Sequence, residues 1–203
     1  MTAAPAPESV PENTDLIPGD DGLYRPQWAY SSAEMLDYFD YEWGKLKEST
    51  PALFEALSLE LLQSGLSWSI ILRKRETIRH AFKNFDPAQV ANFGAEELEQ
   101  LMDNPGVIRH RRKLEAIIAN ARCIQALEVE TTFARWLAAF AAPDCARPAT
   151  FASTPALIPQ AKDLAKALKK AGFQWVGPTT TYSFMQAVGL VDSRPLGCAP
   201  LQG

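Results

Sequence analysis

Apolar residues recur at helical spacing through most of this 203-residue chain. The clearest case is residues 111–127, where the apolar side chains share one face of a helical wheel and the charged side chains lie elsewhere. The apolar set is Leu114, Ile117, Ile118, Ala121, Ile124 and Leu127. From Ser31 onward no segment has the pattern of a strand ladder. The pattern predicts an all-α fold of about eight to ten helices.

Capping residues and prolines mark the expected helix ends. Ser31 and Glu34 have the spacing of a capping box. Three capping side chains stand directly before a proline that would open a helix, in Thr50-Pro51, Asp86-Pro87 and Thr154-Pro155. The sequence Lys169-Lys170-Ala171-Gly172 predicts a helix end.

Charge and proline content divide the chain into two predicted parts. Residues 1–24 are expected to be a flexible acidic extension rich in Pro and Ala, and residues 25–203 a single helical domain. The net charge of −4 resides in the extension, since residues 1–22 carry −5 and the remainder carries +1. A break near Thr131 or in the proline-rich stretch 142–159 is expected to separate two helical lobes, with a cleft at their interface.

Composition excludes several classes of protein. No apolar run approaches the roughly 18 residues of a membrane span, and the N-terminus lacks the features of a secretion signal, so a cytoplasmic protein is expected. Cys123, Cys145 and Cys198 are widely separated, as are His80 and His110. Local spacing therefore predicts neither a disulfide framework nor a metal site.

One carboxylate lies where a helix should be buried. When residues 53–68 are placed on a helical wheel, Glu60 falls beside Leu53 and Leu57 at the edge of the apolar sector, whereas Glu55 points away. A buried carboxylate is costly unless a donor or a cation meets it. Glu60 is therefore a candidate recognition group or acid/base. The alternative is that it caps a neighbouring helix or pairs with an arginine in the core.

Aromatic residues gather in the same part of the chain. They are Trp28, Tyr30, Tyr38, Phe39, Tyr41, Trp43 and Trp68. Such density can simply be core. The functional alternative is a stacking pocket for a flat ring, favoured further if the ring is cationic.

A basic hairpin is predicted after residue 96. An acidic helix ends at Asn104-Pro105-Gly106, and the next helix begins with four cations, Arg109, Arg111, Arg112 and Lys113. Unpaired N–H groups at a helix start favour an anion, and cations of this density suit a nucleic-acid backbone. A solvated basic face is the alternative. A second positive segment, with Arg73, Lys74, Arg75, Arg79 and Lys83, is expected to enlarge this patch.

Several motifs follow one another in a fixed order. They are Asp40-Tyr41-Glu42-Trp43-Gly44, residues 60–68 (ELLQSGLSW), Val107-Ile108-Arg109-His110-Arg111 with Lys113, and Val176-Gly177 followed by residues 182–190 (YSFMQAVGL). Together they resemble the DNA-3-methyladenine glycosylase I family, collinearly over about residues 25–198. The resemblance implies the all-α helix-hairpin-helix DNA glycosylase fold, with two helical lobes, a base-binding cleft between them, and a helix-hairpin-helix near residues 95–127 whose hairpin is residues 104–109.

The family's activity is the removal of 3-methyladenine from alkylated double-stranded DNA by a monofunctional base-excision repair hydrolase, which leaves an abasic site. By position, Glu60 would be the catalytic residue, accepting in its ionised form from the exocyclic amine of the extruded base, and Trp68 would stack on that base. The other pocket residues would be Trp28, Tyr38 and Trp43. Gly106, Arg109, Arg111 and Lys113 would contact DNA, and Leu66 is either a wedge or a buried apolar contact. A monomer without cofactors is expected.

The chain departs from the family at two places. A zinc ion joins the chain ends in the family through two Cys and two His, and the aligned residues here are Pro26, Phe39, Arg194 and Cys198. One thiolate cannot form a tetrahedral site, so we predict no zinc, with apolar packing in its place. Met35 stands where the family often has a tyrosine. These departures leave open a relative that binds DNA or a modified base without efficient excision; a helical interaction scaffold is a further alternative.

Overall fold

The computed structural model describes residues 15–202 and confirms a mainly helical fold. Over these residues it has nine α-helices, two short 3-10 helices and one small antiparallel hairpin. In chain order the elements are β1 (Leu16–Pro18), β2 (Tyr24–Pro26), η1 (Gln27–Ser31), α1 (Ala33–Tyr41), α2 (Thr50–Gln63), α3 (Trp68–Ala81), η2 (Lys83–Phe85), α4 (Pro87–Val90), α5 (Ala95–Asp103), α6 (Arg111–Leu127), α7 (Phe133–Ala138), α8 (Pro159–Lys170) and α9 (Pro178–Ala187).

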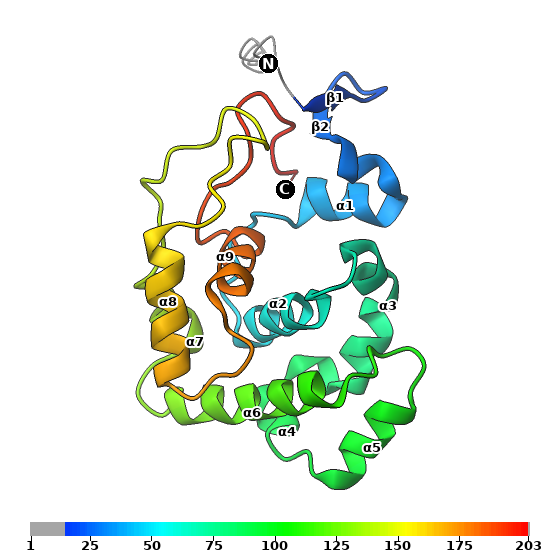
Figure 1. Cartoon of the computed structure of the whole chain (residues 1–203), viewed down its shortest axis with the longest axis vertical. Helices are drawn as coiled ribbons and strands as arrows, with labels where there is room; N and C mark the ends of the chain where they lie inside the picture. Colours follow the sequence, from blue (N-terminus) through cyan, green and yellow to red (C-terminus); the bar gives the residue numbers. More distant parts are fainter. Residues whose placement is uncertain (1–14, 203) are drawn as a thin grey trace, which may run out of the picture.

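Helix α2 is the centre of the molecule. Its residues 53–62 are all buried, and it contacts α3, α6, α7 and α9 (Figure 1). A helix that is apolar on nearly every face must be enclosed by other elements. The two carboxylates of this stretch, Glu55 and Glu60, therefore both lie inside the protein.

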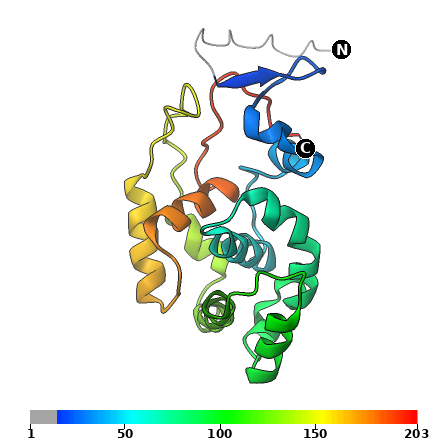
Figure 2. The same cartoon turned by 45° about the vertical axis from the view of Figure 1, so that its right-hand side comes forward.

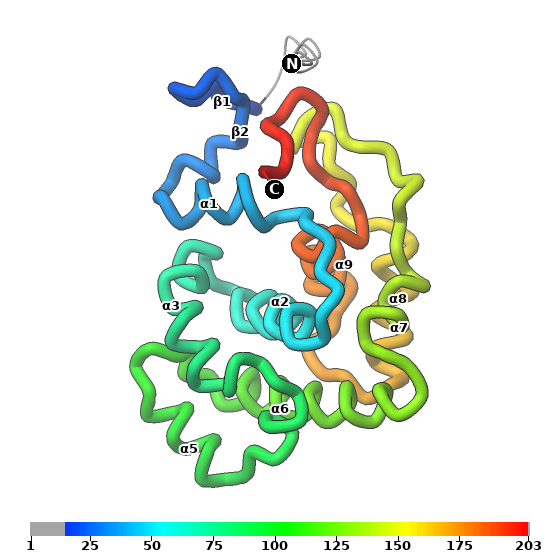
Figure 3. Tube along the Cα trace, turned by 180° about the vertical axis from the view of Figure 1, so that it is seen from behind, coloured from blue at the N-terminus to red at the C-terminus, as the bar shows by residue number. Residues whose placement is uncertain are grey.

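The first and last segments of the described chain lie together beside α1. The backbone N–H of Ala199 donates to Tyr24 O (2.7 Å), and that of Gln202 donates to Asp40 O (2.8 Å). The C-terminal segment accordingly runs next to β2 and α1 when the molecule is seen from either side (Figures 1 and 3). Helix α5 lies at the opposite end of the molecule from the β-hairpin (Figure 2).

The capping predictions are confirmed in part. Asp86 caps α4 through the N–H of Ala88 as expected, and α8 ends at Lys170. The caps of α1 and α2 are Ser32 and Ser49, each one residue from the predicted position. Thr154-Pro155 starts no helix, because residues 139–158 run without a helix until Pro159 opens α8.

The predicted flexible extension is wrong for residues 15–24. Leu16 is buried, and β1 pairs with β2. The carboxylate of Asp15 accepts from the N–H groups of Phe151 and Ala152, at 3.1 and 2.9 Å, and Asp21 pairs with Arg25 at 2.7 Å. These acidic side chains have specific partners, which a reading of net charge alone does not reveal. Residues 1–14 of the predicted extension lie outside the described residues.

Candidate functional site

A cavity of about 480 Å³ lies where α1, α2, α3, α9 and the segment 139–158 meet. Its lining residues are Trp28, Met35, Tyr38, Trp43, Glu60, Gln63, Trp68, Phe151, Thr154, Ser183, Gln186 and Ser193. All five residues predicted to bind or act on a base are among them. The structure thus brings Glu60 and Trp68 into one cavity, together with Trp28, Tyr38 and Trp43.

Glu60 is a buried carboxyl without a partner. It is 8% exposed, and no hydrogen bond or ion pair joins its side chain to any residue from 15 to 202. Burial raises the pKa of Glu60 to about 8. At pH 7 the carboxyl of the free protein is therefore mainly protonated, whereas the ionised form expected from the sequence is that of the complex with the base. A cation entering the cavity would lower this pKa and favour the carboxylate.

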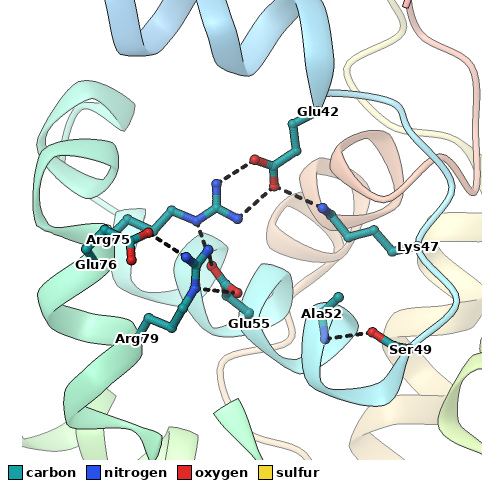
Figure 4. A network of polar contacts seen from close by, with 8 residues as sticks. All are labelled: Glu42, Lys47, Ser49, Ala52, Glu55, Arg75, Glu76 and Arg79. Atoms are coloured by element: carbon teal, nitrogen blue, oxygen red, sulfur yellow. Dashed lines mark hydrogen bonds and ion pairs between the residues drawn. The ribbon is translucent and has the colours of Figure 1, made fainter. Parts of the chain in front are cut away.

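Glu55, five residues earlier on the same helix, has the opposite environment. Its carboxylate accepts from Arg75 Nε (2.6 Å) and Arg79 Nη2 (2.8 Å), and Arg75 also pairs with Glu42 on the far side (Figure 4). Pairing with an arginine in the core was the alternative considered for Glu60. In the structure Glu55, and not Glu60, pairs with core arginines. The carboxyl of Glu60 therefore remains available to a ligand in the cavity.

The same ion pairs correct the predicted second basic segment. Arg75 and Arg79 are engaged by carboxylates, as Figure 4 shows, so they do not enlarge a DNA-binding patch. Burial opposes ionisation of Glu42, but its pairing with Arg75 and Lys47 outweighs this and lowers its pKa to about 2. The network ties the end of α1 to α2 and α3, the three helices that carry Tyr38, Glu60 and Trp68.

Aromatic rings form the walls of the cavity. Trp28 meets Trp43 edge-on with 5.9 Å between ring centroids, and Tyr38 lies 5.2 Å from Trp68 at a tilt of 48°. Trp68 is the first residue of α3, and its buried Nε1 has no hydrogen-bond partner among the described residues. Burial and the nearby Glu60 raise the pKa of Tyr38 well above its usual value, so its phenol stays protonated. Electron-rich faces around one acid suit a flat cationic ring.

Several cavity residues were missed by the sequence analysis. Phe151 and Thr154 come from the segment 139–158, which has no periodicity to signal a buried face; Asp15 fixes it by accepting from the Phe151 N–H. Ser183 and Gln186 lie within the recognised motif 182–190, but nothing in the residue pattern assigned them to the cavity.

The hairpin between α5 and α6 is fixed against α3. The side chain of Lys74 donates to Pro105 O, and the N–H of Gly106 donates to the side chain of Asn104 at 2.8 Å. A Cβ on Gly106 would come within 2.3 Å of Thr77 Cγ2, so only glycine allows this approach. Helix α3 therefore connects the cavity, through Trp68, with the hairpin.

The predicted DNA-binding residues have different environments. Arg109 is exposed, with no ion pair to any other described residue, and Arg111 is exposed and bonded to Glu99 at 2.8 Å. Lys113 is 4% exposed and donates to Leu62 O and Ser64 O, at 2.8 and 2.6 Å. In this position the Lys113 ammonium satisfies carbonyl groups at the C-terminus of α2, which favours a structural role for Lys113 over contact with a phosphate. Leu66, on the turn so fixed, is half-buried against the core.

Trp175 is a residue that the sequence analysis did not single out. It has a φ of +58°, which bulky residues rarely adopt, and its indole lies beside His110 and 5.5 Å from the Lys113 ammonium. The buried side chain of Asn120 fixes the preceding residue, Gln174: its amide nitrogen donates to Gln174 O, and its amide oxygen accepts from the Gln174 N–H. This turn supports the start of α6, the second helix of the hairpin.

No metal site is formed by the described residues. Among residues 15–202 no three His, Cys, Asp or Glu side chains lie together in a group that could hold an ion. Of the four residues that the resemblance aligns with zinc ligands, Pro26 and Phe39 have no donor side chain, and Arg194 carries a guanidinium whose positive charge would repel a metal ion. The donor set therefore does not fit zinc. In the same part of the chain, no helix is both long enough and apolar enough to cross a bilayer.

Known proteins are similar to this chain over most of its length. The family model for methyladenine glycosylase matches residues 28–201. A DNA-3-methyladenine glycosylase of Haemophilus influenzae is 41% identical over 177 residues, covering 86% of this chain and 96% of that protein. A crystal structure of a 3-methyladenine DNA glycosylase I superposes with a TM-score of 0.82 at 42% identity, over 86% of this chain and 98% of the other. A variant of such an enzyme in complex with 3-methyladenine gives 0.80 at 32% identity, over 86% and 97%.

Proposed function

The chain belongs to the methyladenine glycosylase family, and from this premise we propose that the cavity around Glu60 selects an extruded 3-methyladenine. The protein is a base-excision DNA repair glycosylase, a hydrolase of the N-glycosidic bond of that base. The observation that carries the assignment of the site is the unpartnered carboxyl of Glu60 in a cavity walled by Trp28, Trp43 and Trp68.

The chemistry of the damaged base explains why such a site suffices. Methylation at N3 makes the base of the nucleotide cationic and weakens its bond to deoxyribose, so that it can leave as a neutral molecule. Strong acid catalysis is therefore not needed. The enzyme must instead select the damaged base, because an unmodified adenine must not be removed. Methylation loosens base pairing and so lowers the cost of extrusion, a few kcal/mol for an intact base.

Recognition then couples base binding to ionisation of Glu60. As the cationic ring enters, its charge lowers the pKa of the Glu60 carboxyl from about 8, the proton leaves, and the carboxylate accepts from the exocyclic amine. The ring stacks on Trp68. A neutral adenine brings no charge, so it finds a protonated acid that cannot accept in the same way. Discrimination thus comes from charge as well as from the cost of extrusion.

Duplex DNA with an alkylated base is the proposed partner, gripped at the start of α6. No hydrogen bond within residues 15–202 uses the N–H groups of Ile108 or Arg109, and Arg109 adds an exposed charge. These two N–H groups lie in the turn that precedes the N-cap of α6, His110, and successive free N–H groups in such a turn form an anion-binding concavity that suits a phosphate. The hairpin packs against α3, whose first residue is Trp68. The proposed phosphate-binding turn and the base cavity are therefore both held by the same helix. A monomer in the cytoplasm would suffice, because a single lesion imposes no symmetry.

The assay that tests the proposed function measures the product released from methylated duplex DNA. We expect free 3-methyladenine by chromatography and an abasic site in an uncut strand. Borohydride added during the reaction should trap no protein–DNA adduct, since the cavity presents no lysine as a nucleophile. Salt-dependent DNA binding without release of base would instead identify a binder that does not excise. Absence of both would favour the scaffold alternative.

Arg109→Ala should weaken binding to every DNA sequence alike. Removing one phosphate contact is expected to lower the slope of log K against log salt concentration by about 1. Affinity for the free base should be unchanged, because Arg109 does not line the cavity. Fluorescence anisotropy over a salt series measures the slope, with the exposed Arg135 of α7 changed to Ala as the matched control. An unchanged slope for Arg109→Ala would remove this residue from the interface.

A further inference from the structure

A buried arginine joins α1 and the turn after it to the C-terminal segment of the described chain. Arg194 is 5% exposed. Its Nη1 donates to Phe39 O (2.7 Å) and Trp43 O (3.0 Å), and its Nη2 donates to Ala199 O (2.6 Å). The first two carbonyls belong to α1 and the turn after it, and the third to the C-terminal segment. One guanidinium thus cross-links the two segments that, by the resemblance stated above, would be expected to share a zinc ion.

These hydrogen bonds correct the expectation that apolar packing alone takes the place of the zinc ion. Of the two residues expected to supply the apolar packing, Phe39 and Pro26, Phe39 lies in a buried cluster with Cys198 and Ala199. The cross-link inside that cluster is polar, however, because three backbone carbonyls need donors that a hydrocarbon cannot supply. A planar fork of donors can reach all three at once, which a lysine ammonium on its flexible chain cannot do in the same geometry.

The same guanidinium supports the aromatic wall of the base cavity. It lies over the ring of Phe39 at 4.0 Å from the centroid. The Phe39 ring in turn stacks on Trp43 (5.9 Å, 22°) and meets Trp28 edge-on (5.4 Å). Trp28 and Trp43 line the cavity, whereas Arg194 does not. The chain of contacts therefore runs from Arg194 through Phe39 to the two indoles that face the base.

The segment that carries Arg194 is itself held in place. Arg147 donates to Arg194 O (2.9 Å) and Pro195 O (3.0 Å). The segment 139–158, which also places Phe151 in the cavity wall, is therefore hydrogen-bonded to the backbone at Arg194. On the other side, Arg25 forms a buried pair with Asp40, the residue after Phe39, at 2.7 Å. Both neighbours limit the positions that the Arg194 side chain can take.

We propose that Arg194 is a positioning residue for the base pocket: its guanidinium replaces a metal clip, joins the chain ends through Phe39 O, Trp43 O and Ala199 O, and sets Trp28 and Trp43 through Phe39. Its effect on base affinity rests on the proposed function. Its effect on the geometry of the indoles is independent of the proposed function. Base affinity and indole geometry can be measured separately.

The test uses the full-length protein with Arg194→Met, Arg194→Lys and Arg194→Ala, and Arg135→Met as the matched control on an exposed arginine. Near-UV circular dichroism reports the packing of the indoles without any base, and quenching of tryptophan fluorescence reports binding of free 3-methyladenine. Measurements are made at a temperature where far-UV signals show every variant folded. We expect roughly tenfold weaker base binding and an altered near-UV spectrum for the Met and Lys variants, and no change for the control.

Chemical rescue separates positioning from a general loss of structure. Millimolar guanidinium chloride should restore base affinity and the near-UV spectrum to Arg194→Ala, and equal sodium chloride should not. Folded Arg194→Met with wild-type affinity and spectrum would overturn the proposal, as would failure of guanidinium to restore Arg194→Ala. A melting temperature of the wild type that falls with a chelator and returns with zinc would also overturn it. Altered spectra in a protein whose wild type binds no base would contradict the proposed function alone.

Discussion

Glu60→Gln is expected to lower the rate of 3-methyladenine excision by about 100-fold or more while the protein stays folded. The substitution keeps the size and shape of the side chain but removes the only ionisable carboxyl among the residues that line the cavity. Loss of one preorganised electrostatic group from an active site costs roughly 3 kcal/mol of transition-state stabilisation. Single-turnover kinetics on methylated duplex DNA measure the rate directly.

Glu55→Gln is the matched control for this prediction. It makes the same change on the same helix, but at a carboxylate that pairs with Arg75 and Arg79 and does not line the cavity. We expect lower stability, since two half-buried arginines each lose one of their two carboxylate partners, while Arg75 keeps Glu42 and Arg79 keeps Glu76. Excision by the folded fraction should stay close to wild type. Equal losses in the two variants, after correction for the folded fraction, would show that Glu60 has no special role in recognition.

The positions of these two glutamates show what the sequence could predict. Local periodicity places Glu60 at the edge of the apolar sector, where the structure does bury it. The same periodicity places Glu55 away from that sector, which is wrong, because Glu55 is as buried as Glu60. Pairing of Glu55 depends on Arg75 and Arg79, which are 20 and 24 residues away on another helix. Long-range contacts of this kind leave no periodic signal. For the same reason Lys113 was assigned to DNA from its neighbours in sequence, whereas its partners are the carbonyls of Leu62 and Ser64.

Segments without regular structure were the least predictable. Phe151 and Thr154 reach the cavity from a stretch that contains no helix and is fixed by contacts at a distance, such as that of Asp15 with the Phe151 N–H. Arg194 likewise lies in an irregular segment, and its acceptors are backbone atoms, which any residue provides. Periodicity and family motifs located the helices and the core of the site, and the connections between distant segments required the structure.

The second large effect expected of Glu60 is on stability as a function of pH. Burial raises the pKa of Glu60 in the folded protein to about 8 from an ordinary value of 4.5. Between these pH values the folded state keeps a proton that the unfolded chain releases. Because stability falls with pH wherever the native state binds more protons, the Glu60 contribution to the free energy of unfolding is expected to fall by on the order of 5 kcal/mol from pH 4.5 to pH 8.

Comparison of the wild type with Glu60→Gln isolates this contribution, since glutamine does not titrate. The difference in unfolding free energy, from urea denaturation at a series of pH values, should be small near pH 5 and should rise by several kcal/mol in favour of the variant at pH 8. Glu42 does not interfere. Its pKa is lowered to about 2, so its stabilising contribution is complete above pH 4.5 and is lost only as the pH falls toward 2. Parallel curves for the two proteins above pH 5 would mean that Glu60 ionises normally in the free protein. The selection of a cationic base by coupled ionisation would then be wrong, because the cavity would already hold a carboxylate before the base arrives.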